Sequence, residues 1–210
     1  YVVSHDLKEP IRKVEVFARR LLEPGKKVEQ VNMFAEKIVA SASRMQKLME
    51  ALLHYSRLDS LAGNKENVNL TSIIEEVKND LELTISERQA TVEYKSLPVI
   101  EGITFQLHQL FLNLLCNSLK FSKTDETPYI NISSKSVSGE ELPEDLIVKN
   151  KKYYQISVRD NGVGFDQEES SRIFEVFHRL APDATTGTGI GLAIVKKVVQ
   201  NHDGLVIAEG

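Results

Sequence analysis

A seven-residue repeat of mostly apolar side chains over residues 29–58 constrains the fold more than any other feature of this sequence. One row of the repeat consists of Val31, Ile38, Met45 and Leu52, and a second row consists of Phe34, Ser41, Leu48 and Tyr55. This pattern is typical of a long helix with an apolar seam. Residues 2–22 carry the same repeat at Leu7, Val14 and Leu21, and Pro24-Gly25 then interrupts the chain. The sequence therefore predicts two antiparallel helices joined by a tight turn.

The predicted hairpin buries only part of its apolar surface. Pairing of two hairpins into a four-helix bundle would cover the rest, so we expect a homodimer formed through residues 1–60. The polar residues 59–67 indicate a connecting segment. We therefore expect a hairpin unit over residues 1–60, a linker over residues 61–68 and a second unit over residues 69–210.

The hydrophobic period changes after the linker. Helices are predicted over residues 70–88, 104–121, 167–175 and 189–202, and strands over residues 91–94, 97–101, 129–137, 153–159 and 205–208, with a polar insertion over residues 138–152. The helices and strands do not alternate, which favours an α+β fold over a doubly wound parallel sheet. The second unit is thus predicted to be a layer of helices packed on a sheet.

The composition argues against several classes of protein. A membrane-spanning helix needs about 20 consecutive apolar residues, whereas the longest apolar runs here are four residues, Leu192–Val195 and Leu205–Ala208. We therefore expect no direct membrane contact from this segment. The formal net charge of −4 disfavours a nucleic-acid partner. Cys116 is the single cysteine, which excludes a disulfide framework within the chain and favours a reducing, cytoplasmic setting.

His5 is the candidate for the chemical step. It precedes the Leu7 seam by two residues and is in register with Arg12 and Arg19, so we expect its ring to face solvent on the outside of the bundle. A neutral imidazole in that position is an accessible nucleophile. Asp6 follows directly and could orient the ring or accept its proton. Because an isolated surface histidine usually has no role, this interpretation depends on the rest of the sequence.

Three polar residues share one face of the helix predicted over residues 104–121. Asn113, Asn117 and Lys120 follow one another at spacings of four and three residues, which places them in line. An Asn oxygen can bind Mg2+ that is also held by nucleotide phosphates. A Lys supplies a positive charge for a phosphate. A solvated polar stripe would give the same pattern.

Two glycine-containing segments follow this helix. In Asp160-Asn-Gly-Val-Gly164, Gly162 and Gly164 allow a sharp turn, and Asp160 could accept a hydrogen bond from an adenine amino group. The segment Gly187-Thr188-Gly189-Ile-Gly191 opens a predicted helix, where backbone N–H groups attract an anion. An ordinary Asn-Gly turn would also explain the first segment. The second lacks the GxGxxG spacing of a dinucleotide-binding fold.

The order of these segments resembles the core of a sensor histidine kinase. Ser4–Pro10 is similar to the family's H box, Asn113–Phe121 to its N box, Asp160–Gly164 to its G1 box, Ile173–Phe177 to its F box and Gly187–Gly191 to its G2 box. This resemblance covers nearly the whole chain. It implies a dimerisation and histidine-phosphotransfer hairpin, followed by an ATP-binding α/β sandwich of the Bergerat type. The implied function is ATP-dependent autophosphorylation and phosphoryl transfer to an Asp of a response-regulator receiver domain.

The resemblance also implies roles for single residues. It makes His5 the phosphoacceptor, Asn117 the Mg2+ ligand and Asp160 the adenine contact, with Asn113 and Lys120 supporting the metal and the phosphates. Further nucleotide contacts are implied for the residues of the two glycine segments and just after the F box, which are Gly162, Gly164, Gly187, Thr188, Gly189, Gly191 and Arg179.

Other functions remain open from the sequence. Related ATPases carry a Glu four residues before the Mg2+ Asn to activate water, and Asn113 stands there instead, which argues against an efficient hydrolase. A dimeric scaffold without catalysis, or a Ser/Thr kinase of the same nucleotide fold, would also fit parts of the sequence. Glu9 stands where many members carry the Thr or Asn that helps to dephosphorylate the partner. We expect the chain to be a fragment of a longer receptor, with a short lid between Leu180 and Gly187.

Overall fold

The computed structural model describes residues 2–60, 64–138, 152–180 and 187–210. The side chains of residues 2–7, 54, 57, 59 and 60 lie outside this description. Most of the expected polar insertion and the whole expected lid also lie outside the described residues.

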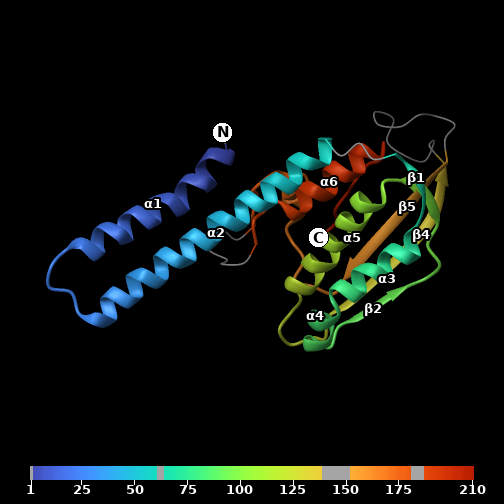
Figure 1. Cartoon of the computed structure of the whole chain (residues 1–210). Coiled ribbons are helices and arrows are strands. Elements are labelled where there is room, and N and C mark those ends of the chain that lie inside the picture. The colour runs from blue at the N-terminus through green and yellow to red at the C-terminus, as the bar shows by residue number, and fades with distance from the viewer. Residues whose placement is uncertain (1, 61–63, 139–151, 181–186) are drawn as a thin grey trace.

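Helices α1 (Val2–Leu22) and α2 (Val28–Ser60) form the predicted hairpin. Figure 1 shows it extending away from the rest of the molecule, with the C-terminal part of α2 lying beside α6. Within the hairpin the Phe34 row of α2 is buried at Phe34, Ser41 and Leu48. The rings of Phe17 and Phe34 stack with their centroids 6.0 Å apart.

The hairpin leaves much apolar surface exposed. Val39 and Leu53 of α2 are 66% and 57% exposed, and Ile11 of α1 is 44% exposed. In the Val31 row of the repeat, Val31 is exposed and the other three residues are only half-buried. A single hairpin therefore does not cover its own apolar face, which is the situation in which helical hairpins pair.

The remaining helices and strands form a two-layer α/β unit, which confirms the predicted fold class. Its elements are β1 (Glu66–Asn69), α3 (Leu70–Asp80), α4 (Glu82–Glu87), β2 (Thr91–Tyr94), β3 (Val99–Gly102), α5 (Thr104–Lys120), β4 (Tyr129–Ser138), β5 (Lys152–Asp160) and α6 (Gly191–Asn201). Strand β4 lies between β2, to which it is parallel, and β5, to which it is antiparallel. Strands β1 and β3 pair antiparallel in a separate two-stranded sheet.

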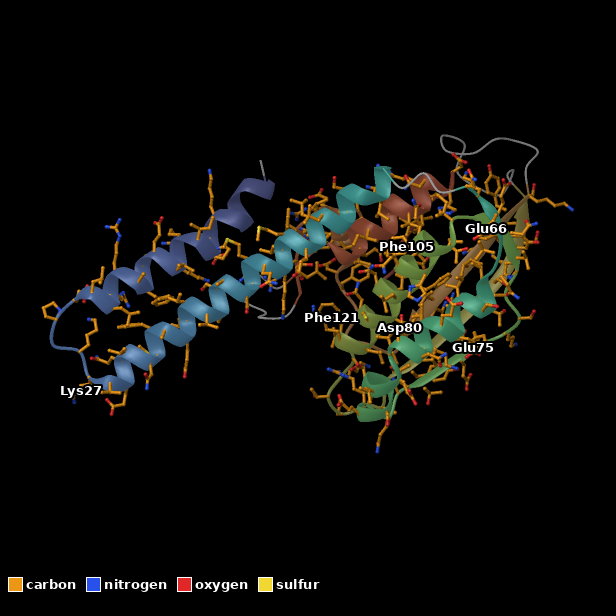
Figure 2. The ribbon with its side chains drawn as sticks, in the orientation of Figure 1. Lys27, Glu66, Glu75, Asp80, Phe105 and Phe121 are labelled. Carbon is orange, nitrogen blue, oxygen red and sulfur yellow. The ribbon has the colours of Figure 1, made fainter. Side chains whose placement is uncertain are left out.

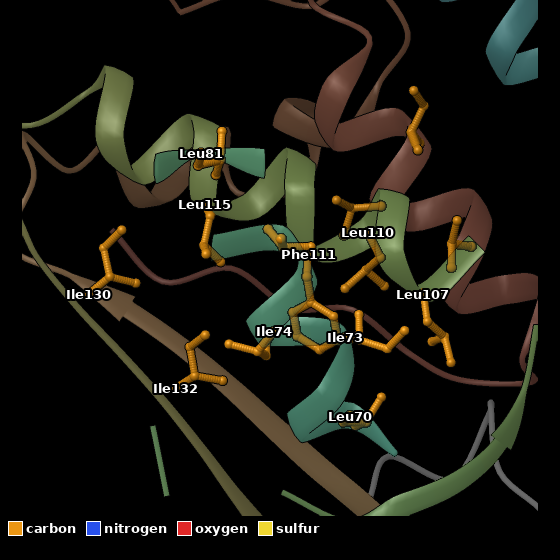
Figure 3. Close-up of a cluster of buried hydrophobic side chains, with 14 of the residues drawn as sticks. Leu70, Ile73, Ile74, Leu81, Leu107, Leu110, Phe111, Leu115, Ile130 and Ile132 are labelled. Carbon is orange, nitrogen blue, oxygen red and sulfur yellow. The ribbon is translucent and has the colours of Figure 1, made fainter. Parts of the chain in front are cut away.

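The core lies between the helices and one face of the sheet (Figure 3). Helix α5 is central to it, because residues 107, 110, 111 and 115 recur at helical spacing and all four are buried apolar side chains. They pack with Ile73 and Ile74 of α3 and with Ile130 and Ile132 of β4. The opposite side of α5 is left free to carry polar residues.

Several predicted elements differ from the structure. The helix predicted over residues 70–88 is broken at Leu81, which ends α3 and precedes α4. Residues 167–175 form two short 3-10 turns, η3 (Gln167–Glu169) and η4 (Arg172–Phe174), instead of an α-helix. The strand predicted over residues 205–208 is absent from this described segment. Its backbone instead bonds to a side chain, with Ala208 O accepting from Gln167 Nε2 at 3.2 Å.

The expected linker is shorter in the structure than in the sequence prediction. Helix α2 continues to Ser60, and Glu66 already pairs with Gly102 in β1. The end of α2 is also bonded to the α/β unit. Leu58 O accepts hydrogen bonds from Gln106 Nε2 of α5 at 3.3 Å and from Asn201 Nδ2 of α6 at 3.1 Å. These bonds satisfy one of the carbonyl groups that a helix C-terminus leaves without a helical partner.

Candidate functional site

The H-box segment lies in the first turns of α1. The backbone of His5 and Asp6 is helical, but their side chains lie outside those that the structure describes. Arg12 and Arg19, which follow His5 by one and two heptads, are both exposed. The expectation that the His5 ring faces solvent stays a prediction.

The three polar residues of α5 lie on one face of that helix, as predicted. Asn113, Asn117 and Lys120 are all half-buried. Asn113 donates from Nδ2 to Gln109 O at 2.7 Å, which leaves its Oδ1 atom directed away from the helix backbone. The face therefore offers amide groups and an ammonium group next to the loop that leads into α6.

The glycine loop brings the N-terminus of α6 against this face. Gly187 and Gly189 have positive φ angles of 99° and 73°. A Cβ atom on Gly191 would lie only 2.9 Å from Asn113 Oδ1 and 3.8 Å from Asn117 Nδ2, so glycine permits the close approach. No side chain caps the start of α6 within the described residues. Its first N–H groups are donors that an anion could use.

Two cationic side chains meet at the same place. Lys120 Nζ lies so close to Gly187 that a Cβ atom there would clash with it, and it is 4.3 Å from the centre of the Phe121 ring. Burial lowers the pKa of Lys120, and the nearby charge of Arg179 lowers it further. Arg179 Nη2 is buried and has no hydrogen-bond partner among the described residues. An unpaired buried donor beside a second cation is unfavourable without an anion, so the arrangement fits a phosphate group.

Asp160 ends β5 with both carboxylate oxygens already oriented. Oδ1 accepts from Gly162 N at 2.9 Å, and Oδ2 accepts from Ser118 Oγ of α5 at 2.7 Å. The turn is close to α5, since a Cβ on Gly162 would lie 2.8 Å from Phe121 O. Each oxygen retains a lone pair for a further donor. A fixed carboxylate of this kind can select an amino group on a planar ligand.

A hollow of about 450 Å³ lies between the end of the G1 segment and the residues that follow the F box. Gly164, with a φ of 65°, contributes to its lining from the G1 segment, and Arg179 contributes from the segment after the F box. Other contacts bring the predicted N, G1 and G2 boxes together, because Ser118 bonds to Asp160 and Gly191 lies against Asn113. Figure 2 marks Phe121, which lies directly after α5 at this end.

Ser118 is a site residue that the sequence analysis missed. It is buried and bonds to Asp160, which is 42 residues away in the chain. Its place inside the N-box segment, next to Asn117, is a clue that could have drawn attention to it. Cys116 lies in the same N-box segment, but its side chain is exposed, whereas that of Ser118 is buried.

The fold and the site define an ATPase-like α/β sandwich joined to a helical hairpin. The chain belongs to the family of histidine kinase-, DNA gyrase B- and HSP90-like ATPases, which matches residues 102–209. Residues 1–61 match the His Kinase A (phospho-acceptor) domain. The chain thus contains both parts of a histidine kinase core, which confirms the family that the sequence motifs resemble.

Individual proteins show the same similarity. Cyanobacterial phytochrome A of a Nostoc species is 35% identical over 213 residues, covering 100% of this chain and 26% of the phytochrome. Full-length ShkA, solved in complex with AMPPNP, has a TM-score of 0.61 and 25% identity over 100% of this chain and 42% of ShkA. ThkA, solved in complex with the response regulator protein TrrA, shares the fold, with a TM-score of 0.62 and 20% identity over 96% of this chain and 54% of that chain. The chain spans about a quarter of the length of the phytochromes it matches.

None of the described helices is both long enough and apolar enough to span a membrane.

Proposed function

We propose that this chain is the catalytic core of a sensor histidine kinase, which transfers the γ-phosphoryl group of ATP to His5 and then to an Asp of a response-regulator receiver domain. One observation carries the proposal. Arg179, with a buried donor that has no partner in the described part of the chain, lies beside Lys120 at the end of α5. This convergence of positive charge lies next to the glycine loop and fits the phosphates of a nucleotide.

Different residues bind the adenine and the phosphates of ATP in this proposal. Asp160, fixed by Ser118 and Gly162, accepts the hydrogen bond of the adenine amino group. Lys120, Arg179 and the first N–H groups of α6 neutralise and orient the phosphates. Positioning and charge neutralisation account for most of the catalysis of phosphoryl transfer.

The Asn pair on α5 fits a Mg2+ ion. An amide oxygen is a suitable ligand for Mg2+, which usually keeps several waters and shares phosphate oxygens. Gly191 allows the start of α6 to lie within reach of both Asn113 and Asn117. We assign the direct ligand role to Asn117 and the supporting role to Asn113. When bound, the ion would neutralise charge between the phosphate groups.

His5 receives the phosphoryl group in this proposal. Its imidazole attacks the γ-phosphorus while Asp6 orients the ring or accepts its proton, and ADP leaves. The α/β unit would deliver the phosphate to the hairpin over residues 1–60, to which it is joined by the short connection between the end of α2 at Ser60 and the start of β1 at Glu66. Asn113 stands where the hydrolases carry a Glu, which favours transfer over hydrolysis.

The partners follow from the hairpin. Its exposed apolar face supports a homodimer through residues 1–60, in which a second copy covers side chains such as Val39 and Leu53. The match to a phospho-acceptor domain and the ThkA–TrrA complex support a receiver domain as the recipient of the phosphoryl group. The single cysteine supports a cytoplasmic setting.

Incubation with ATP labelled on the γ-phosphate tests the proposal. The chain should acquire a label that acid removes and that a receiver domain can take over, and His5→Gln should abolish the labelling. A label that persists in His5→Gln would refute the acceptor assignment. Mg2+-dependent release of free phosphate without any label would favour an ATPase, and no Mg2+-dependent nucleotide binding would favour a scaffold.

A further inference from the structure

The turn that carries Arg179 is fixed on one side by the glycine loop. Phe177 has a φ of 68°, in the left-handed region, and its N–H donates to Gly189 O at 2.8 Å. Gly189 has a positive φ as well, and a Cβ atom there would lie 2.7 Å from the carbonyl carbon of Phe177. The two segments therefore pack backbone against backbone, with no room for a side chain between them.

The other side of the turn is fixed by a carboxylate. Glu169 Oε2 lies 2.9 Å from Nε2 of His178, and Glu169 Oε1 accepts from Arg172 Nη1 at 2.9 Å. Because an ionised carboxylate only accepts hydrogen bonds, Nε2 of His178 carries the proton in this arrangement. The side chains of His178 and Glu169 are only 16% and 29% exposed, so water competes weakly for this bond.

Arg179 directly follows His178 in the chain. Holding the ring of His178 therefore restricts the backbone that directs the Arg179 guanidinium group. Glu169, Arg172, His178 and Arg179 all line the hollow of about 450 Å³ next to the G1 segment. The buried Nη2 of Arg179 has no partner among the described residues, so no hydrogen bond of that atom to them fixes its direction.

We propose that Glu169 and His178 are positioning residues for the phosphates of ATP: Glu169 holds His178, and this pair keeps Arg179 directed at the phosphate site. The inference rests on the proposed function, because it takes ATP as the ligand. In this inference Glu169 acts through His178 and Arg179 rather than by binding the nucleotide itself. Its removal should therefore weaken the binding of phosphates and leave the recognition of adenine unchanged.

Titrations with ATP and with adenosine, each in competition with a fluorescent ATP analogue, separate these effects. Glu169→Ala should weaken ATP binding about tenfold, within the range of couplings measured in hydrogen-bonded networks, and leave adenosine binding unchanged. Glu169→Gln keeps an oxygen acceptor for His178 and should restore most of the affinity. Glu168→Ala is the matched control, because Glu168 is exposed and the neighbouring carboxylate is intact. In an Arg179→Ala background, Glu169→Ala should cause no further loss.

The opposite results overturn the inference. An equal loss of ATP and adenosine affinity would make Glu169 a general structural residue, and so would a loss that persists without Arg179. If Glu169→Ala prevents folding, His178→Phe carries the same test, since it removes the N–H donor and keeps the ring volume. Failure of the unaltered chain to bind ATP would be a different result, because it refutes the proposed function itself.

Discussion

Removing the hydroxyl group of Ser118 should weaken ATP binding without changing any residue that the sequence motifs assign to the nucleotide. Ser118 Oγ donates to Asp160 Oδ2 at 2.7 Å, and Gly162 N holds the other oxygen at 2.9 Å. In Ser118→Ala the carboxylate is held at one oxygen only and can rotate. Because Ser118 is buried on α5, water replaces this bond poorly.

The expected loss of ATP affinity in Ser118→Ala follows from the charge of Asp160 and the exposure of the Ser118–Asp160 hydrogen bond. A hydrogen bond to a charged group contributes about 1.5–3 kcal/mol. Asp160 is exposed, so the lower end of that range applies. A loss of about 1.4 kcal/mol corresponds to a tenfold increase in Kd. We therefore expect a roughly tenfold weaker affinity for ATP and a smaller preference for ATP over GTP.

Calorimetric titration of both nucleotides measures this prediction directly. Ser72→Ala is the matched control, because Ser72 is exposed on α3, away from the site, and should leave both affinities unchanged. An unchanged ATP affinity in Ser118→Ala would refute the reasoning that a fixed Asp160 recognises adenine. So would an equal loss for ATP and GTP.

Three further predictions concern other parts of the chain. Gly189→Ala should cost at least about 1–2 kcal/mol in unfolding free energy, measured with urea, because the added Cβ meets Phe177 and φ is positive. Gln106→Leu should lower stability by about 1–3 kcal/mol, seen as a lower Tm, because the buried amide that bonds Leu58 O is lost. ATP affinity should fall as the pH rises through the lowered pKa of Lys120, because deprotonation removes the charge that binds phosphate, and Lys120→Arg should move that loss to higher pH. An unchanged urea midpoint in Gly189→Ala would contradict the first prediction, and an unchanged Tm in Gln106→Leu would contradict the second. The third would be contradicted if Lys120→Arg lost ATP affinity at the same alkaline pH as the unaltered chain.

Local patterns in the sequence predicted the elements that position the site. The seven-residue repeat indicated both helices of the hairpin, and the spacing of Asn113, Asn117 and Lys120 placed them on one face of α5. The glycines at 187, 189 and 191 correctly marked the start of α6. These features depend on neighbours within a few residues, so periodicity and turn chemistry are sufficient to predict them.

Local sequence patterns did not predict the contacts between segments that are distant in the chain. The Ser118–Asp160 bond requires α5 and the end of β5 to meet, and the Leu58–Gln106 bond requires α2 to reach α5. Residues 205–208 have the composition of a strand, but Ala208 bonds to the side chain of Gln167. In each case the deciding partner lies about 40 residues away or more, which a local pattern does not specify.

The most direct test of the account is to locate the phosphate on the chain after incubation with Mg2+ and ATP. Digestion at neutral pH followed by mass spectrometry of the peptides should place it on His5. Asn117→Ala should lose the modification while its hairpin remains folded. A phosphate on any Ser, Thr or other His, or modification of His5 that continues unchanged in Asn117→Ala, would contradict the account.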